Sequence, residues 1–560
     1  MKVKSIGLLF GGMFIALGLF AAGCGALQGD STGSEQPREE ALLFDTDELY
    51  GECRLSNLRD FSGAVLEIPE FYQGKKVVEI GRLSGDASLD EIEKIVLPQS
   101  VKKIGDYAFY GMSNLAEIVV SDEAVLERIG DQAFANCSSL TEYALPATVK
   151  TVGEEAFMGC SALTEFTVGA NAESIEINTF LGCEALTAIN VDAENLYYSS
   201  RDGVLFDKDK TNLIEYPYGK TTESYTVPAT VSEIGAWAFF GNKTLRTIDL
   251  NQAIMVRKYA FAECSNLTAI SADKIKYAEI GVVEETPWLN NKTNDFIMLG
   301  GVLLEYRGSA KAVSLERAVS ISPFAFAENK NLKSITIDNT LSRIDDRAFY
   351  KCENLSAVYM NNTNRMVVIG TNVFGRNAAD RKIYVPRNLY DKYKKDVYWK
   401  QYFTSLAVHQ TTIKFNGNGG SACADGSVEY LGYVGELPVP EKEGYKFLGW
   451  YDNPDFAGKK IDTGLSWDSM EEKVTLYARY EEKKPIVYPI NYHPNGGTIA
   501  VGAVHTYTAE DDVILPTATK SGYEFKGWYY DEEFTRPAGS GWKKGETGIK
   551  YLYAKWEAVK

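Results

Sequence analysis

Hydrophobic residues return along residues 92–377 with a regular spacing. The clearest marker is a phenylalanine, usually preceded by alanine, and neighbouring markers stand 22 to 25 residues apart except for two longer steps of 59 and 65. The nine markers are Phe109, Phe134, Phe157, Phe180, Phe239, Phe261, Phe326, Phe349 and Phe374. A fixed period of this length predicts a solenoid, in which each coil buries its apolar face against the next.

Within one repeat the pattern predicts strand and turn rather than helix. In residues 140–163, apolar positions alternate around Tyr143 and Leu145, which is typical of a half-buried strand. Pro146 lacks a backbone donor and ends that strand, and Gly153 permits the turn before Phe157. Because no apolar run is long enough for a stable helix, we expect a mainly β protein.

The cysteines follow the same period. Five of the eight stand three residues after a marker phenylalanine: Cys137, Cys160, Cys183, Cys264 and Cys352. No C-x-x-C pair occurs, so we predict a buried ladder of small apolar groups rather than metal or redox chemistry. An occasional disulfide between neighbouring coils stays open.

The consensus L-x-x-[IV]-x-[LVI]-P-x-x-V-x-x-I-G-x-x-A-F-x-x-C-x-x-L resembles the BspA-like leucine-rich repeats of bacterial surface proteins. The resemblance extends over about residues 66–406. It implies a right-handed leucine-rich-repeat solenoid, and such arrays are associated with adhesion and protein binding.

The solenoid is expected to carry caps and two insertions. Residues 41–91 echo a repeat without its alanine-phenylalanine pair and are predicted to form the N-terminal cap. Insertions near 190–223 and 271–311 account for the two long steps, and residues 204–206 and 213–216 predict a hairpin in the first. The second is interpreted as a similar hairpin. Aromatic spacing in residues 378–410 predicts an amphipathic helix that closes the C-terminal end.

The turn of the first hairpin has a calcium-binding alternative. Asp207 and Asp209 are spaced like the start of a calcium loop, but the glycine and the closing glutamate are missing. An ordinary hairpin turn is therefore favoured.

Residues 411–482 and 486–560 hold a second kind of repeat, present twice. The first copy contains FNGNGG at 415–420 and GYKFLGWY at 444–451, and the second contains YHPNGG at 492–497 and GYEFKGWY at 522–529. The glycine turns predict small β modules, with cores that include Phe447, Trp450, Phe525 and Trp528. These motifs look like the Listeria–Bacteroides repeat, similar to the internalin B repeats. That resemblance implies a β-grasp-like fold that serves as a spacer or a weak interaction module.

The N-terminal residues predict export. Lys2 and Lys4 precede an apolar stretch at 6–22, which is followed by Gly23 and Cys24. Residues 1–23 look like a bacterial lipoprotein signal, which implies a diacylglycerol on Cys24; a transmembrane helix is the alternative, for which the stretch is short. Residues 24–40 are interpreted as a flexible tether. We expect a membrane-anchored lipoprotein that faces outside the cytoplasm, on either an outer membrane or a Gram-positive cell membrane.

Two groups of side chains are candidate partner contacts. Hairpins beside a solenoid often lie on its binding face, which selects Tyr197, Tyr198, Tyr216, Tyr218 and Trp288. Packing of each ring against the adjacent coil is the favoured alternative for any single one. The second group consists of strand positions that point outward: Val119, Ala144, Thr167, Asn190, Asp249, Thr336 and Tyr359. A solvent-exposed face without a binding role explains this group equally well.

The net charge and the positions of the histidines limit the classes of function that the sequence supports. The net charge of −18 disfavours nucleic-acid binding, and none of His409, His493 and His505 stands in a catalytic or metal-binding motif. We expect no enzyme activity and no catalytic, cofactor or metal site. The favoured function is adhesion-type binding of a protein on a host or neighbouring cell. The alternative is a cell-envelope scaffold or polysaccharide-binding module in which Trp288, Tyr197 and Tyr198 stack on sugars.

Overall fold

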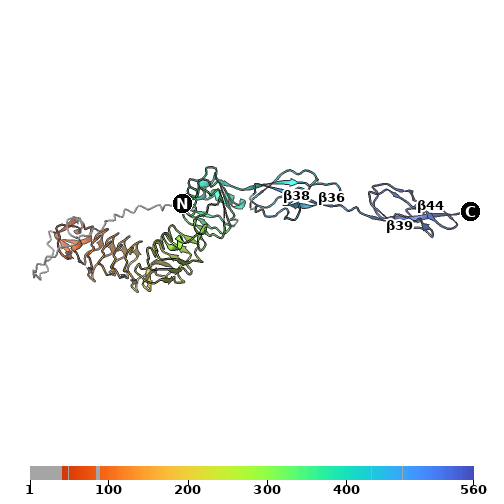
Figure 1. The fold of residues 1–560 in the computed structure, drawn as a ribbon. Coiled ribbons are helices and arrows are strands. Elements are labelled where there is room, and N and C mark those ends of the chain that lie inside the picture. Colours follow the sequence, from red (N-terminus) through yellow and green to blue (C-terminus); the bar gives the residue numbers. More distant parts are fainter. Residues whose placement is uncertain (1–40, 48, 84–88, 363, 431, 470) are drawn as a thin grey trace. The chain divides into compact units, whose positions relative to one another are not determined.

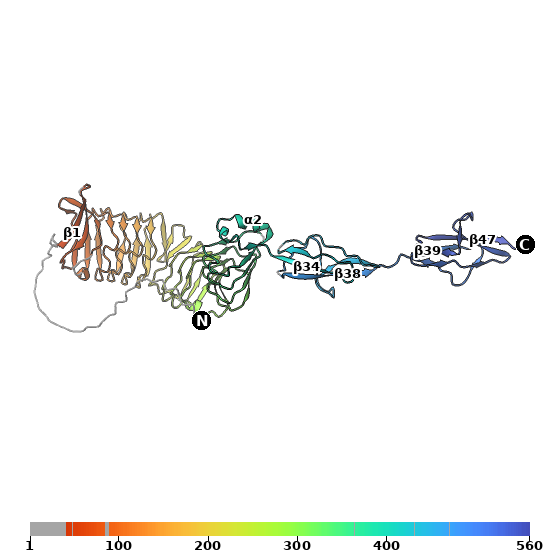
Figure 2. The same cartoon turned by 90° about the horizontal axis from the view of Figure 1, so that it is seen from above.

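The structure is a computed structural model that describes residues 41–47, 49–83, 89–362, 364–430, 432–469 and 471–560. These residues fall into two compact units that divide between Thr293 and Asn294. The predicted signal segment 1–23, the predicted tether 24–40 and the predicted lipidation site Cys24 lie outside the described residues. Figures 1 and 2 show stacked coils in each unit and two β modules in the second.

Each regular coil of the first unit contributes one longer strand and one two-residue strand, and within a sheet each strand pairs in parallel with its counterpart in the neighbouring coil. The longer strands form three sheets: β3 (Val65–Glu67), β6 (Lys94–Leu97) and β8 (Glu117–Val120); β10 (Glu142–Ala144), β12 (Glu165–Val168) and β14 (Ala188–Val191); β18 (Ser224–Thr226), β20 (Thr247–Asp249) and β22 (Ala269–Ser271). The two-residue strands are β7 (Lys103–Ile104), β9 (Arg128–Ile129), β11 (Thr151–Val152), β13 (Ser174–Ile175), β19 (Glu233–Ile234), β21 (Met255–Val256) and β23 (Tyr277–Ala278).

The first unit begins with an antiparallel hairpin of β1 (Leu42–Asp47) and β2 (Glu52–Leu58). Strand β2 pairs in parallel with β5 (Lys75–Ile80), which pairs with β7 and so starts the series of two-residue strands. Strand β4 (Phe71–Tyr72) pairs with β5, and a short 3-10 helix, η2 (Leu89–Glu91), precedes β6. Antiparallel pairing at this end gives the first coil a partner without extending the parallel stack.

Coils of the same kind begin the second unit. Its longer strands form one sheet of β26 (Ala312–Leu315), β28 (Ser334–Ile337), β30 (Ala357–Met360), β32 (Lys382–Tyr384) and β33 (Leu406–Ala407). Its two-residue strands are β27 (Ser320–Ile321), β29 (Arg343–Ile344) and β31 (Val368–Ile369). With both units dominated by stacked parallel strands, the predicted mainly β solenoid is confirmed.

The predicted closing helix is confirmed as α2 (Arg387–Lys395), labelled in Figure 2, and it is followed by a 3-10 turn, η3 (Trp399–Tyr402). Three aromatic side chains satisfy backbone groups of the last coil. The Tyr393 hydroxyl accepts from the Val367 amide at 3.0 Å, and the Trp399 Nε1 donates to the Val367 carbonyl at 2.7 Å. The Tyr402 hydroxyl accepts from the Phe374 amide at 3.4 Å.

The two insertions are hairpins whose last strand belongs to a coil. In the first, β15 (Tyr198–Arg201), β16 (Val204–Asp207) and β17 (Asn212–Glu215) are antiparallel neighbours, and β17 pairs in parallel with β19. In the second, β24 (Phe296–Leu299) and β25 (Val302–Tyr306) form the hairpin, and β25 pairs in parallel with β27. The predicted hairpins are confirmed, but the idea that they interrupt the array is wrong, because each supplies a coil strand.

The second predicted insertion also contains a regular coil that the sequence pattern missed. The Phe261 amide donates to the Val282 carbonyl at 2.9 Å, just as the Phe134 amide donates to the Ala156 carbonyl at 2.8 Å. Val282 and Val283 therefore take the places of alanine and phenylalanine, and both are buried. The short helix α1 (Pro287–Asn290) follows them.

The marker phenylalanines form a buried ring ladder along each stack. In the first unit, ring centroids are 5.2 Å apart for Phe109 and Phe134 and 5.1 Å apart for Phe134 and Phe157. The ladder resumes with Tyr216, which stacks on Phe239 at 4.7 Å. In the second unit, Tyr306 takes the corresponding place beside Phe326, with ring centroids 4.9 Å apart and ring planes tilted by 32°. Both tyrosines are therefore phenylalanine equivalents brought in by the hairpins.

Each coil turns through left-handed residues on either side of its alanine-phenylalanine pair. Glu155 (φ +55°) precedes Ala156, and Gly159 (φ +72°) follows Phe157 by two residues. The same two positions are left-handed in other coils, and most of the residues before the pair are not glycine, such as Tyr107 and Trp237. Gly153, at the start of this turn, is not left-handed, so the turn does not use a glycine conformation there.

The two C-terminal modules share one sheet order. The first reads β35 (Gly426–Glu429), β34 (Gln410–Asn416), β38 (Lys473–Glu482), β36 (Tyr445–Tyr451) and β37 (Lys460–Ile461). The second reads β41 (Thr506–Tyr507), β39 (Tyr488–His493), β47 (Lys550–Ala558), β44 (Tyr523–Tyr529) and β45 (Pro537–Gly539). Two small pairs complete it: β40 (Thr498–Ile499) with β43 (Ala518–Thr519), and β42 (Val513–Ile514) with β46 (Gly541–Trp542).

The predicted module cores are confirmed for the tryptophans. Trp450 and Trp528 are buried, and each Nε1 donates to a proline carbonyl twelve residues earlier, at 2.8 Å to Pro438 and at 2.6 Å to Pro516. Phe447 and Phe525 are half-buried against these indoles. Because equivalent residues make equivalent bonds, the modules are two copies of one fold. Their likeness to a β-grasp stays a prediction.

Candidate interaction surface

Outward side chains of the longer strands form rows in register across neighbouring coils. Ala144 lies opposite Thr167, and Thr167 lies opposite Asn190. Asp249 lies between Thr226 and Ser271 in the third sheet of the first unit. Residues that face solvent on adjacent parallel strands are about 4.8 Å apart, so these rows present closely spaced polar groups.

In the second unit, the row of outward side chains on the longer strands begins with polar residues and continues with aromatic ones. Thr336 lies opposite Tyr359, which lies opposite Tyr384. The rings of Tyr359 and Tyr384 stack at 4.8 Å, and His409 packs edge-on against both. Burial raises the pKa of Tyr359, with contributions from Tyr384 and Glu472. The candidate contact Tyr359 is therefore half covered by its own chain.

Of the hairpin aromatics, Tyr197 is 49% exposed and Tyr218 is half-buried. Tyr198 is buried, and its hydroxyl accepts from the Ile175 amide at 2.8 Å and donates to the Glu173 carbonyl at 3.4 Å. Tyr216 belongs to the ring ladder described above. Tyr198 and Tyr216 are therefore not available as the partner contacts that the sequence suggested, because the hairpin turns them towards the adjacent coil.

Trp288, also predicted as a partner contact, is likewise buried. It lies in α1 with 6% of its surface exposed, and its amide donates to the Leu267 carbonyl at 2.8 Å. The Thr286 hydroxyl caps this helix by accepting from the Leu289 amide, and Lys292 covers the indole at 4.7 Å. The side chain therefore closes the end of a coil and does not offer a ring face to a ligand.

Sequence reasoning missed a cluster of half-buried aromatic rings on the turns of the first unit. Trp237 lies 4.6 Å from Phe240 and 4.7 Å from Tyr259, measured between ring centroids. Trp237 and Tyr259 occupy the left-handed position before the alanine-phenylalanine pair. The sequence does contain a pattern that could have predicted this cluster. The position two residues before the marker phenylalanine is aromatic in four coils, at Tyr107, Trp237, Tyr259 and Phe324.

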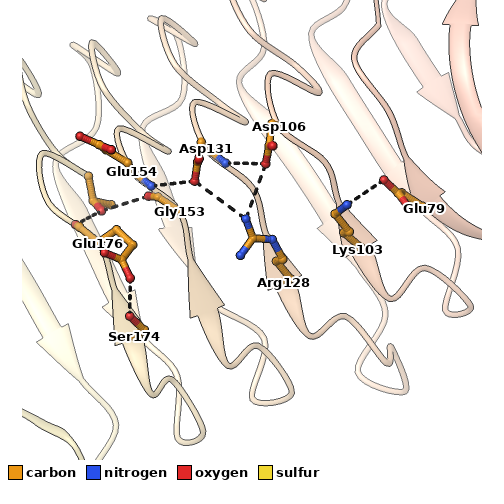
Figure 3. A network of polar contacts seen from close by, with 10 residues as sticks. Glu79, Lys103, Asp106, Arg128, Asp131, Gly153, Glu154, Ser174 and Glu176 are labelled. Carbon is orange, nitrogen blue, oxygen red and sulfur yellow. Dashed lines mark hydrogen bonds and ion pairs between the residues drawn. The ribbon is translucent and has the colours of Figure 1, made fainter.

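A chain of carboxylate contacts runs along the turns of the first unit (Figure 3). Asp106 Oδ1 accepts from the Asp131 amide at 3.0 Å, and Asp131 Oδ1 accepts from the Glu154 amide at 3.1 Å. Arg128 lies 3.6 Å from Asp106 and 3.9 Å from Asp131. A Cβ on Gly153 would lie 2.3 Å from Asp131 Oδ1, so this glycine is required for close approach. The carboxylates are thus bound within the chain.

The cysteine ladder has a hydrogen-bonding role in addition to packing. The Sγ of Cys160 donates to the Phe134 carbonyl at 3.2 Å, and the same bond recurs at Cys137, Cys183, Cys264 and Cys352. Burial raises the pKa of Cys160, Cys264 and Cys352 to about 12. All the described cysteines are free thiols, and the prediction of small buried groups is confirmed.

The carboxylate of Asp207 finds its hydrogen-bond donors within its own hairpin turn. Its Oδ1 accepts from the amides of Thr211 at 2.6 Å and Asn212 at 2.8 Å, so the carboxylate is bound within the turn. The favoured hairpin turn is confirmed. Across the described ranges, no three histidine, cysteine or acidic side chains are grouped so that they could hold a metal ion.

Comparison with known proteins agrees with the two kinds of repeat. The family model for the BspA type leucine rich repeat region matches six copies at residues 87–201, 216–291 and 306–419, which together make up more than half of the chain. The model of the Listeria-Bacteroides repeat domain matches residues 412–479 and 488–555.

Curated relatives share only part of their length with this chain. A protein of Evansella cellulosilytica described as a Gly-rich membrane protein is 35% identical over 158 residues, which are 28% of this chain and 17% of the relative. Internalin H of Listeria monocytogenes is 34% identical over 97 residues, 17% of this chain and 16% of the internalin. The chain therefore covers less than a fifth of either relative. In the part of the chain that the structure describes, no helix has the length and hydrophobicity needed to cross a bilayer.

Solved structures of similar proteins include the pneumococcal vaccine antigen PcpA, at 20% identity and a TM-score of 0.39, with 66% of this chain and 96% of that chain covered. A leucine rich cell surface protein of Faecalibacterium prausnitzii has 20% identity and a TM-score of 0.31, with 60% and 97% covered. At these values the likeness adds nothing to what the coils themselves display.

Proposed function

Because the chain belongs to the BspA-type leucine-rich repeat family, we propose that it is a lipid-anchored bacterial surface protein that binds a protein of a host or a neighbouring cell. The observation that carries the proposal is the row of outward side chains held in register by the strands, such as Ala144, Thr167 and Asn190. The parallel strands fix their backbone, so binding costs little ordering of the surface.

The aromatic cluster of Trp237, Phe240 and Tyr259 supports protein binding from a second side. Tryptophan and tyrosine are enriched among the residues that contribute most to protein interfaces, because a large ring is buried at low entropic cost. Tyr197, with half of its surface exposed, is a further candidate contact. The remaining candidates Tyr218, Asp249, Thr336 and Tyr359 stay proposals of the same kind.

The binding surface is tested with two double variants of the full chain. Thr167→Arg with Asn190→Arg adds bulk and charge to the row, whereas Asp122→Arg with Glu123→Arg adds the same side chains to an exposed turn outside it. Crosslinking on intact cells followed by mass spectrometry should identify a protein partner that the first variant loses and the second retains. Equal capture by both variants, or no saturable capture by the unmodified chain, would contradict the proposal.

The lipid anchor is tested separately at Cys24. Cys24→Ser removes the sulfur to which diacylglycerol would be attached, so the protein should leave the membrane fraction and lose metabolic labelling with an alkynyl fatty acid. Cys423→Ser, which changes a half-buried cysteine elsewhere, should retain both. Labelling that persists in Cys24→Ser would exclude this anchor.

The alternative function, polysaccharide binding by aromatic stacking, has less support in the structure than in the sequence. Two of the three rings that motivated it, Trp288 and Tyr198, are buried, which leaves Tyr197. A glycan array with the unmodified chain and Tyr197→Ala distinguishes the two functions, since sugar binding that depends on Tyr197 would favour the alternative.

A further inference from the structure

A cavity of about 150 Å³ lies in the first unit, where the first hairpin joins the stack. It is bounded by β13 on one side and by β16, β17 and the turn after β19 on the other, and apolar walls come from Ile175, Phe180, Leu205 and Ile214. On the β13 side of the cavity, the ring centroids of Phe157 and Phe180 are 6.4 Å apart, compared with 5.1 Å for Phe134 and Phe157. The lining also includes the polar residues Glu176, Thr179, Asn212 and Glu215, and a cavity of this volume can hold a ligand of about six heavy atoms.

At the cavity, a glutamate occupies a position that other coils give to alanine. The Tyr216 amide donates to the Ala238 carbonyl at 2.8 Å, which is the bond that the marker phenylalanine makes in a regular coil. Glu215 therefore stands where Ala133, Ala156 and Ala238 stand in theirs, and in those coils the alanine is fully buried.

Two side chains at the cavity, Glu215 and Asn212, have oxygen atoms that can still accept hydrogen bonds. Among the described residues the Glu215 carboxyl makes no hydrogen bond or ion pair, and burial raises its pKa well above the ordinary value. Asn212 Oδ1 is buried without a hydrogen-bond partner. The Thr179 hydroxyl is already used, because it donates to the Glu176 carbonyl at 2.6 Å. A buried acceptor without a donor costs free energy, so the site is complementary to a donor.

The wall chemistry decides which donor fits. A divalent metal ion needs about six oxygen ligands, and the described part of the chain has no metal-binding group here. A water molecule can donate to both acceptors, but it carries no charge to pair with an ionised Glu215 and it leaves the apolar walls uncovered. An ammonium group offers three donors and a positive charge to Glu215, while a short hydrocarbon chain fits the walls.

We propose that this cavity binds an aliphatic primary ammonium group. The nitrogen donates to the Glu215 carboxylate and to Asn212 Oδ1, and the hydrocarbon lies against Phe180, Leu205 and Ile214. The group can belong to a free amine, or to a lysine side chain of a partner protein; the second source rests on the proposed protein-binding function, and the first does not.

The test uses calorimetric titration of the full chain with n-pentylamine, with 1-pentanol as the neutral probe of similar shape. One pentylammonium should bind per chain, and the affinity should fall at least tenfold in Glu215→Gln. Glu194→Gln, which removes the same charge from an exposed residue outside the cavity, should bind as the unmodified chain does. Titration in two buffers of different ionisation enthalpy should reveal proton release, because Glu215 ionises when the cation binds.

Several results would overturn the proposal: no saturable binding of pentylamine, equally tight binding of pentanol, or unchanged binding by Glu215→Gln. If Glu215→Gln does not fold, Asn212→Leu provides the second variant, with the same tenfold loss expected. Binding of Nα-acetyl-lysine N-methylamide would assign the site to a lysine side chain, and its failure beside pentylamine binding would assign it to a free amine. The Thr167→Arg, Asn190→Arg variant should bind pentylamine normally, so failure of the partner surface and failure of the cavity remain distinguishable.

Discussion

At the scale of single residues, the solenoid depends on positions where one side chain reaches into the next coil. Asp131 is the clearest case, because its carboxylate accepts from the Glu154 amide and occupies the space beside Gly153. Asp106 and Gly130 repeat this arrangement one coil earlier. The paired choice of glycine and aspartate therefore follows from the close spacing of the coils.

Gly153→Ala should destabilise the first unit by about 1 to 3 kcal/mol, the usual cost of forcing extra volume into a packed site. The added Cβ would meet Asp131 backbone nitrogen at 2.5 Å, and a backbone atom cannot move aside cheaply. Gly435→Ala is the control, because nothing lies within 4 Å of its Cβ. Urea unfolding followed by circular dichroism measures both; equal stability of the two variants would show that the coils can separate freely.

Glu215 should make the first unit less stable as pH rises. Its pKa in the folded chain is raised, so the folded state holds the proton that the unfolded state releases above about pH 4.5. The contribution to the free energy of unfolding is complete below that pH and is lost at about 1.4 kcal/mol per pH unit up to the folded pKa. Unfolding curves of the unmodified chain and Glu215→Gln between pH 4 and 8 should therefore diverge. Parallel curves would mean that this carboxyl titrates normally.

At the scale of elements, the stack depends on its ends. Interior coils exchange backbone hydrogen bonds with both neighbours, whereas the last coil has only one. In the second unit, α2 and η3 supply side-chain oxygen and nitrogen atoms to the groups left over, at Val367 and Phe374. An aromatic cap is suited to this position because each ring covers apolar surface and ends in a polar atom.

Tyr393→Phe should cost about 1 to 3 kcal/mol, because it leaves the Val367 amide buried without an acceptor while preserving the ring. Tyr398→Phe is the matched control, since Tyr398 is 60% exposed and should tolerate the change. Hydrogen exchange at the last coil reports the loss locally. Unchanged protection in Tyr393→Phe would show that this hydroxyl does not hold the cap.

At the scale of the whole molecule, the chain is a series of separate hydrophobic cores. The solenoid core of the second unit extends from Leu303 to Leu406, whereas each C-terminal module has its own core around Trp450 or Trp528. Since no apolar residue is shared between the two module cores, each should unfold without the other.

Trp528→Ala should destabilise the second module by about 3 to 5 kcal/mol, the usual cost of truncating a buried aromatic residue, and leave the first module intact. Trp450→Ala should do the reverse. Limited proteolysis followed by mass spectrometry shows which module is cut. Cleavage in both modules of either variant would mean that they fold cooperatively.

The sequence alone determined the periodic part of this protein. Apolar residues at a fixed spacing leave stacking as the only way to bury each coil, so the phenylalanine and cysteine ladders, the hairpin strands, the closing helix and the duplicated modules could all be predicted. It could not determine which irregular residues join the ladders. Tyr216, Tyr306 and Val283 do so because of backbone pairing between coils, which leaves no mark on residue type.

The tertiary structure alone decided which side chains are available at the surface. Tyr198, Tyr216 and Trp288 have the composition of contact residues, but the hairpins and α1 fold them against a neighbouring coil. Glu215 has the composition of a surface residue, yet the bond from Tyr216 to Ala238 places it in the inward alanine column. The physical reason is that the period fixes the spacing of coils, whereas hydrogen-bond register fixes which side of the backbone faces inward.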